Sequence, residues 1–189
     1  MEEKELIRLS QQGNDEAFEA LVKKYQRKVF QLAFSITQDR TNADDIAQEV
    51  FLKAYMALRK FKFKSSLGTW LYQITVNHVK DYFRKTKKIK LISLEDTQAI
   101  ASNEEDEMIL REKRQIENER KKLVHKALQT LPGKYKIILS LRDIQGFSYG
   151  EIVDILNISP GTVDSRLHRA RKMLRKKIAS LTILRGGEL

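Results

Sequence analysis

Apolar residues recur with the period of an α-helix through the first part of the chain. Between residues 15 and 37 they stand three or four positions apart, which predicts an amphipathic helix. Its stripe consists of Phe18, Leu21, Val22, Tyr25, Val29, Leu32, Ala33 and Ile36. Asn14 is a suitable N-cap. After a polar turn at residues 38–41, Thr41 is expected to cap a second helix. The inner stripe of that helix is Ile46, Val50, Phe51, Ala54 and Leu58.

A third helix is predicted from about Thr69, with Leu71, Ile74 and Tyr82 facing inward. The pattern then changes, because residues 95–107 hold six acids, no cation and few large apolar side chains. Such a composition favours a flexible segment, here expected over residues 89–107. A helical pattern resumes near Met108 and strengthens from Leu123 to Leu131. Pro132 and Gly133 then break it, and another short helix is expected from Tyr135 to Arg142.

The stretch from Ser148 to Lys177 has the pattern of two short helices joined by a tight turn. Ser148 and Glu151 have the spacing of a capping box, and the first helix is expected to end near Leu156. Asn157 tolerates the left-handed backbone of a turn, and Ser159 followed by Pro160 suits the start of the second helix. This helix-turn-helix has a basic second helix, whose cations repel one another unless a polyanion neutralises them. The sequence therefore favours DNA binding by this helix over the alternative that its charged face is only exposed to solvent.

The pattern predicts an all-α fold of two small helical domains joined by a flexible linker. The expected bounds are 1–88 for the first domain, 89–111 for the acidic linker, 112–182 for the second domain with its helix-turn-helix, and 183–189 for a tail.

Composition changes this picture in two respects. The chain of 189 residues carries a formal net charge of +11, which points to nucleic acid as a partner, although a membrane surface would also attract it. It has no cysteine, no apolar run long enough for a bilayer, and no signal-peptide pattern at its start. We therefore expect a cytoplasmic protein without membrane insertion.

Two further clusters of residues bear on which partners the chain binds. One cluster interleaves aromatic residues and an amide with cations, a pattern typical of single-stranded nucleic-acid binding. Its members are Phe61, Phe63, Trp70, Tyr72 and Asn77 with Lys60, Lys62, Lys64 and Arg84. A tryptophan in a small helical domain is as often a core residue, so both interpretations of Trp70 stay open. The second predicted helix exposes acids, which favours a protein partner, although Asp44 and Asp45 also suit the positive end of a helix. Asp45 and Glu49 have metal-ligand spacing, but no third ligand follows, so no metal or other cofactor is expected.

Three segments together resemble a known family. They are DDIAQEVFLKAY, then FKFKSSLGTWLYQITVNHVKDYFRK, then LPGKYKIILSLRDIQGFSYGEIVDILNISPGTVDSRLHRARKML. In this order, with an acidic linker between them, they resemble the extracytoplasmic-function sigma factors of bacterial RNA polymerase. The resemblance covers almost the whole chain. It implies a sigma factor that directs core polymerase to specific promoters and helps to open the minus-ten element.

The resemblance also implies roles for particular residues. The first domain resembles sigma region 2, and its polymerase-binding candidates are Asp45, Gln48, Glu49 and Leu52. The candidates for capturing the opened minus-ten strand are Phe61, Phe63, Lys64, Ser65, Ser66, Trp70, Asn77 and Arg84. The second domain resembles region 4, which reads the minus-thirty-five element. There Ser165, His168 and Arg169 would face bases, and Arg166, Arg171 and Lys172 would hold phosphates. The implied partners are core RNA polymerase, promoter DNA and an anti-sigma factor.

Three other function classes have less support in the sequence. A stand-alone helix-turn-helix regulator would explain the basic helix, but it does not need the aromatic loop. An enzyme has little support, because His78, His125 and His168 are scattered and no catalytic set or phosphate-binding glycine loop is present. A structural RNA binder would fit the charge but not the paired domains.

Overall fold

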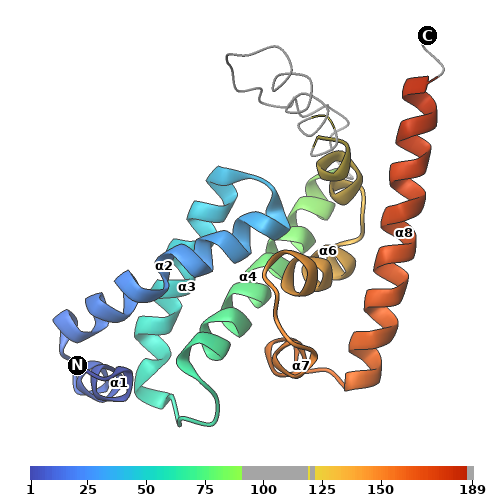
Figure 1. Ribbon diagram of the computed structural model, residues 1–189. Helices are drawn as coiled ribbons and strands as arrows, with labels where there is room; N and C mark the ends of the chain where they lie inside the picture. Colours follow the sequence, from blue (N-terminus) through green and yellow to red (C-terminus); the bar gives the residue numbers. More distant parts are fainter. Residues whose placement is uncertain (91–118, 120–121, 187–189) are drawn as a thin grey trace, which may run out of the picture.

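The computed structural model describes residues 1–90, 119 and 122–186, and all the regular elements in these residues are helical (Figure 1). The N-terminal group consists of α1 (Glu3–Gln11), α2 (Asp15–Thr37), α3 (Arg40–Ala57), the 3₁₀ turn η1 (Leu58–Lys60) and α4 (Leu67–Lys90). The C-terminal group consists of a helical stretch at residues 122–129, then α6 (Gly133–Leu139), the π-helical turn η2 (Ser140–Ile144), α7 (Tyr149–Leu156) and α8 (Pro160–Gly186). The predicted all-α class is confirmed. The segment expected to be a flexible linker lies outside the described residues from residue 91 onward, whereas residues 89 and 90 still belong to α4.

Local chemistry explains where several helices begin. The Asn14 side chain accepts a hydrogen bond from the Ala17 backbone N–H at 2.8 Å, which confirms the predicted cap of α2. The prediction for α3 was wrong by two residues: the cap is Asp39, which accepts from the Asn42 N–H at 3.0 Å, and Thr41 lies inside the helix. Both are good cap types, so the pattern alone could not choose between them.

The start of α4 was also predicted too late. Ser66 accepts a hydrogen bond from the Thr69 N–H at 3.0 Å, so the helix includes Leu67 and Gly68. Gly68 allows this helix start to lie against Tyr25 of α2, because a β-carbon there would be only 3.1 Å from the tyrosine ring. The phenol of Tyr25 in turn donates to Glu3 of α1 at 2.8 Å.

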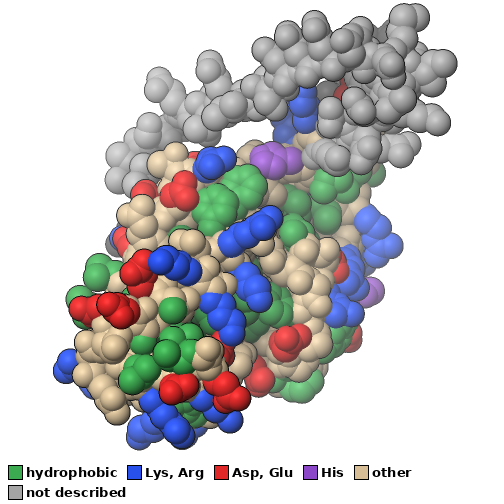
Figure 2. Space-filling view, turned by 60° about the vertical axis from the view of Figure 1, so that its left-hand side comes forward, with side chains coloured by type: hydrophobic (Ala, Val, Ile, Leu, Met, Phe, Trp, Pro, Cys, Tyr) green, Lys and Arg blue, Asp and Glu red, His purple; other side chains and the backbone are tan. Residues whose placement is uncertain are grey.

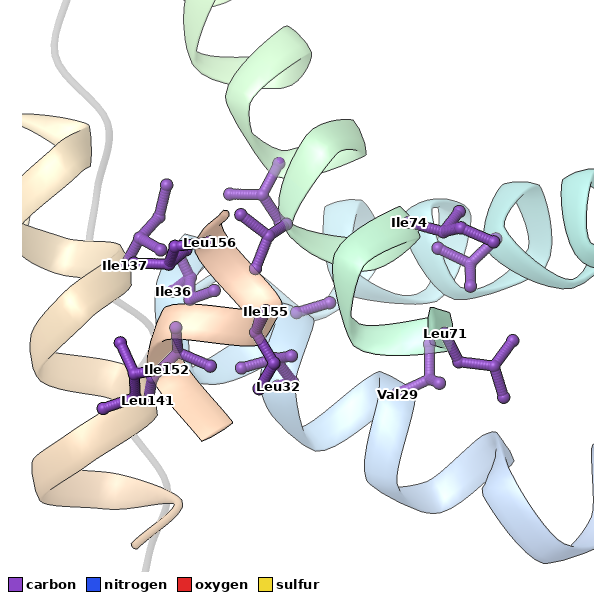
Figure 3. Close-up of a cluster of buried hydrophobic side chains, with 14 of the residues drawn as sticks. Val29, Leu32, Ile36, Leu71, Ile74, Ile137, Leu141, Ile152, Ile155 and Leu156 are labelled. Carbon is purple, nitrogen blue, oxygen red and sulfur yellow. The ribbon is translucent and has the colours of Figure 1, made fainter. Parts of the chain in front are cut away.

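The core does not stop at the boundary between the two groups. Figure 3 shows Leu32 and Ile36 of α2 beside Ile152, Ile155 and Leu156 of α7, and all five are buried. Side chains of α6 and η2 complete the same hydrophobic cluster. The two helical groups therefore lie directly against each other, an arrangement that the sequence pattern did not predict.

Candidate nucleic-acid interface

The loop between η1 and α4 is built around three aromatic rings. The Phe61 ring is buried, with its centroid 5.2 Å from that of Phe63 and 5.1 Å from that of Trp70. Phe63 itself is exposed and has a φ of 56°, a left-handed backbone that is uncommon for a bulky residue. Such strain persists where surrounding structure enforces it, and it is frequent at ligand-binding sites.

Helix α1 helps to hold this loop in its conformation. The Gln11 amide donates to the carbonyl of Leu58 at 3.0 Å and to that of Phe61 at 2.9 Å. Neither α1 nor the role of Gln11 was predicted from the sequence. The helix has nine residues, and Ile7 is its buried anchor. Leu6 and Leu9, three positions apart, gave a weak periodic signal that could have indicated the helix, whereas nothing in the sequence indicated the partner of Gln11.

Trp70 lies at the wall of a cavity of about 760 Å³. Its indole is partly buried, so it is neither sealed in the core nor fully in solvent. On the loop side the cavity is lined by Lys60, Lys62 and Lys64 as well as by Trp70, and on the opposite side by Asn157 and Ser159 of the helix-turn-helix. An aromatic face beside three cations can stack on a base while the cations contact its phosphates.

Apart from Phe63, which is not among the residues that line the cavity, the other candidates for the minus-ten strand divide into two sets. Phe61, Lys64, Ser65 and Ser66 line the cavity together with Trp70. Asn77 and Arg84 lie seven and fourteen residues beyond Trp70, on the same side of α4 but about 10 and 21 Å further along it. Both are exposed, and Arg84 forms an ion pair with Asp81 at 3.2 Å.

The four polymerase-binding candidates share one exposed face of α3. Asp45, Gln48, Glu49 and Leu52 follow the i, i+3, i+4, i+7 spacing, and Leu52 is 60% exposed. Glu49 is tied to α4, because its carboxylate lies 2.9 Å from Nδ1 of His78. Tyr55 and Met56, the latter 71% exposed, continue the apolar part of this face. Their spacing from Leu52 was visible in the sequence, but they were not among the predicted residues.

This face adjoins a groove of about 470 Å³ between α2 and α3, which Gln48 lines with Phe30 and Phe51. Figure 2 brings the left-hand side of Figure 1 forward and shows exposed hydrophobic side chains between acidic and basic ones. A mixed surface of this kind is suited to a protein partner rather than to DNA alone.

The helix-turn-helix has the predicted local geometry. The Glu151 carboxylate accepts from the backbone N–H and the hydroxyl of Ser148, and the Ser148 hydroxyl accepts from the Glu151 N–H, which completes the capping box. Asn157 has a φ of 51°, as the turn requires. Ser159 then accepts from the Thr162 N–H at 3.3 Å at the start of α8.

Most of the residues predicted to contact DNA lie on the outer face of α8. His168, Arg169 and Lys172 are exposed, while Ser165 and Arg166 are partly buried. The Ser165 hydroxyl donates to the Thr162 carbonyl, so it is already engaged within the helix.

Arg171 differs from the other cations of this helix. Its guanidinium makes two contacts with Asp143 of η2, from Nε at 3.2 Å and from the terminal nitrogen at 2.5 Å. The hydrogen bond to Asp143 raises the pKa of Arg171. A phosphate would have to compete with this carboxylate for the side chain.

Comparisons with known proteins place both helical groups in one family. The sigma-70 region 2 family model matches residues 21–89, and the sigma-70 region 4 family model matches residues 121–174. The ECF RNA polymerase sigma-E factor of Escherichia coli (strain K12) is 36% identical over 182 residues, which cover 93% of this chain and 94% of that protein.

This chain belongs to the sigma-70 family.

Within the family it is an alternative RNA polymerase sigma factor of the ECF type, as the resemblance implied. The region 2 match contains the aromatic loop and the exposed face of α3, and the region 4 match contains the helix-turn-helix. The family consists of transcription initiation factors. In the residues that the structure describes, no group of three potential metal ligands occurs, and no helix is long and apolar enough to cross a membrane.

Two solved structures share the fold. The structure of CnrH in complex with the cytosolic domain of CnrY has a TM-score of 0.63 and 25% identity, covering 93% of this chain and 96% of that one. RpoE in complex with the anti-sigma factor NepR from Bartonella quintana has the same TM-score at 24% identity, covering 86% and 96%.

Proposed function

We propose that this sigma factor selects promoters through two DNA contacts that core polymerase holds in register. The basic helix α8 reads the duplex of the minus-thirty-five element, and the aromatic loop holds the opened strand of the minus-ten element. The placement of Trp70 carries the proposal, because its partly buried indole stands beside three lysines at the wall of a cavity. We propose no reaction for the chain itself.

The energetics of strand opening suit this arrangement. Flipping a base out of the stack costs a few kcal/mol. Stacking on an aromatic side chain contributes about 1–3 kcal/mol per base, so one or two stacked bases offset much of that cost. A duplex-only regulator has no use for such a loop, which is why the sigma function is preferred over the stand-alone regulator.

The exposed face of α3 is the proposed polymerase contact. Its chemistry combines an apolar centre at Leu52 with the acids Asp45 and Glu49, so it would fit a partner helix with apolar and basic positions.

The proposed location of this protein is the bacterial cytoplasm, because polymerase and promoter DNA are found there.

We also propose an anti-sigma partner. The fold is shared with RpoE, which was crystallised with the anti-sigma factor NepR. Exposed apolar residues on α3, Leu52, Tyr55 and Met56, offer a surface that such a partner could cover.

Reconstitution tests the proposed function. The purified chain is mixed with core RNA polymerase, captured, and assayed for transcription from promoter fragments selected by the same holoenzyme. Leu52→Ala is expected to reduce capture several-fold, whereas Lys53→Ala, an exposed neighbour outside the predicted face, should not. Failure of the unmodified chain to bind core polymerase would refute the proposal.

A further inference from the structure

Helix α1 contacts the first end of the aromatic loop, which spans residues 61–66 between η1 and α4. In Figure 1 this helix lies beside the lower end of α3, where the chain turns towards α4. The partly buried side chain of Gln11 donates to the Leu58 carbonyl and to the Phe61 carbonyl. An amide nitrogen has two N–H donors, so both are engaged. The Leu58 carbonyl also accepts from the Phe61 N–H at 2.9 Å. A single side chain of α1 therefore holds the start of η1 and the residue that follows it.

The same helix reaches the other end of the loop through Tyr25 of α2. The Tyr25 hydroxyl donates to the Glu3 carboxylate at 2.8 Å, and Lys24 forms an ion pair with that carboxylate. The Tyr25 side chain is buried, and its ring lies against Gly68 in the first turn of α4, where a β-carbon would be only 3.1 Å away. Helix α1 therefore contacts one end of the aromatic loop directly and the other end through one intervening residue.

These contacts restrict the conformation of the loop between its two ends. Phe63 has a left-handed backbone, which a bulky residue keeps only where its surroundings enforce it. The Phe61 ring packs between the rings of Phe63 and Trp70, so a displacement of Phe61 would disturb both neighbours. A loop that is already ordered binds a ligand more tightly than one that loses its freedom on binding. Contacts that order the loop therefore favour binding of the strand.

We propose that Gln11 is a positioning residue for strand capture, which holds the aromatic loop in its binding conformation without contacting DNA itself. The inference rests on the proposed function for the identity of the strand, whereas the coupling between α1 and the loop is a property of the free chain. Ile7, which is 2% exposed, anchors α1 in the core independently of Gln11. The helix should therefore stay in place when Gln11 is changed, so that loop conformation and domain folding can be measured separately.

The replacement Gln11→Met tests the proposal, because methionine is similarly long and flexible but has no N–H donor. As holoenzyme with core polymerase, the variant is expected to bind a single-stranded oligonucleotide of the selected minus-ten strand about five-fold more weakly. Fluorescence anisotropy measures this affinity. Capture by core polymerase and affinity for the minus-thirty-five duplex should equal those of the unmodified chain. Gln12→Met, at the exposed neighbouring position, is the matched control and should change none of these quantities.

Tyr25→Phe tests the other end of the loop through an independent contact. The change removes the hydroxyl that joins Tyr25 to Glu3 but keeps the ring against Gly68. Strand binding is expected to weaken a few-fold, with unchanged capture by core polymerase. This variant carries the test if Gln11→Met does not fold.

Fluorescence of the free chain gives a readout that does not depend on polymerase. Trp70 is the only tryptophan, so quenching by acrylamide follows the environment of the loop. Gln11→Met is expected to increase the quenching constant while the helical circular dichroism is retained, whereas Gln12→Met should leave it unchanged.

Three results would overturn the inference. The first is unchanged strand binding by a folded Gln11→Met holoenzyme, and the second is unchanged quenching of Trp70 in this variant. The third is an equal loss of strand binding, duplex binding and polymerase capture, because a domain that is merely destabilised would give that result. Failure of the proposed function looks different: the unmodified holoenzyme would then not bind the strand, while quenching in the free chain would still respond to Gln11→Met.

Discussion

At the scale of single residues, two arginines on α8 show how neighbours can differ in role. Arg169 is exposed and points away from the buried stripe of Val163, Leu167 and Ala170. Arg171, two positions further, is held by Asp143. The sequence predicted both as DNA contacts, because charge and position were visible in it and the partner from η2 was not.

Arg169 is the proposed base reader, so Arg169→Ala should relax specificity at one position of the upstream element. A good contact to a base edge contributes about 1–3 kcal/mol of discrimination. The measurement is holoenzyme binding to promoters with each single upstream base changed. Lys172→Ala is the matched control and should weaken holoenzyme binding to all promoter sequences alike. The same uniform loss for Arg169→Ala would make this residue a phosphate contact instead.

Asp143→Ala should release Arg171 to bind a phosphate. One additional phosphate contact steepens the dependence of log affinity on log salt by about 0.9. The slope is measured by titrating the holoenzyme with promoter duplex over a series of salt concentrations. The double change of Asp143 and Arg171 to alanine should remove the increase. An unchanged slope in the single variant would show that Asp143 does not withhold Arg171 from the DNA.

At the scale of elements, the capping box links the stability of α7 to pH. The hydrogen bonds from the Ser148 hydroxyl and backbone N–H lower the pKa of Glu151. The unfolded chain therefore binds this proton more readily than the folded chain. The stabilisation is complete well above the ordinary glutamate pKa of about 4.3 and is lost as the pH falls through that value and the lower folded pKa.

Glu151→Gln keeps the shape of the side chain but removes this titration. Its melting temperature is expected to lie below that of the unmodified protein at pH 7, with the difference shrinking as the pH falls below the ordinary glutamate pKa of about 4.3. Thermal unfolding followed by circular dichroism at several pH values measures it. A difference independent of pH would show that the carboxylate charge does not contribute to the cap.

The helices themselves could largely be predicted from the sequence, for physical reasons. Long amphipathic stripes such as that of α2 and strong cap residues such as Asn14 and Ser148 act locally, so their consequences are visible in the pattern. The predictions were wrong or incomplete where the start or the existence of a helix depends on contacts between residues distant in sequence. The start of α3 was set by Asp39 rather than Thr41, and the short helix α1 depends on packing against its neighbours.

At the scale of the whole molecule, the pattern indicated two helical groups but not that they pack together. Tyr72 and Phe83 had the appearance of ordinary aromatic residues on an amphipathic helix, and their partners Phe147 and Gly133 lie far away in the sequence. For Trp70 the sequence left core and stacking roles open. In the structure the Trp70 ring is partly buried and lines the cavity.

In the proposed function, the aromatic loop holds the separated strand while α8 binds the duplex. Permanganate reactivity of promoter thymines in the holoenzyme complex measures strand opening separately from duplex binding. If one base stacks on the indole, Trp70→Ala should reduce opening roughly 5-fold to 150-fold, corresponding to about 1–3 kcal/mol, with duplex affinity little changed. Trp70→Phe keeps an aromatic face and should retain most of the opening. Unchanged permanganate reactivity in a folded Trp70→Ala holoenzyme would contradict the account.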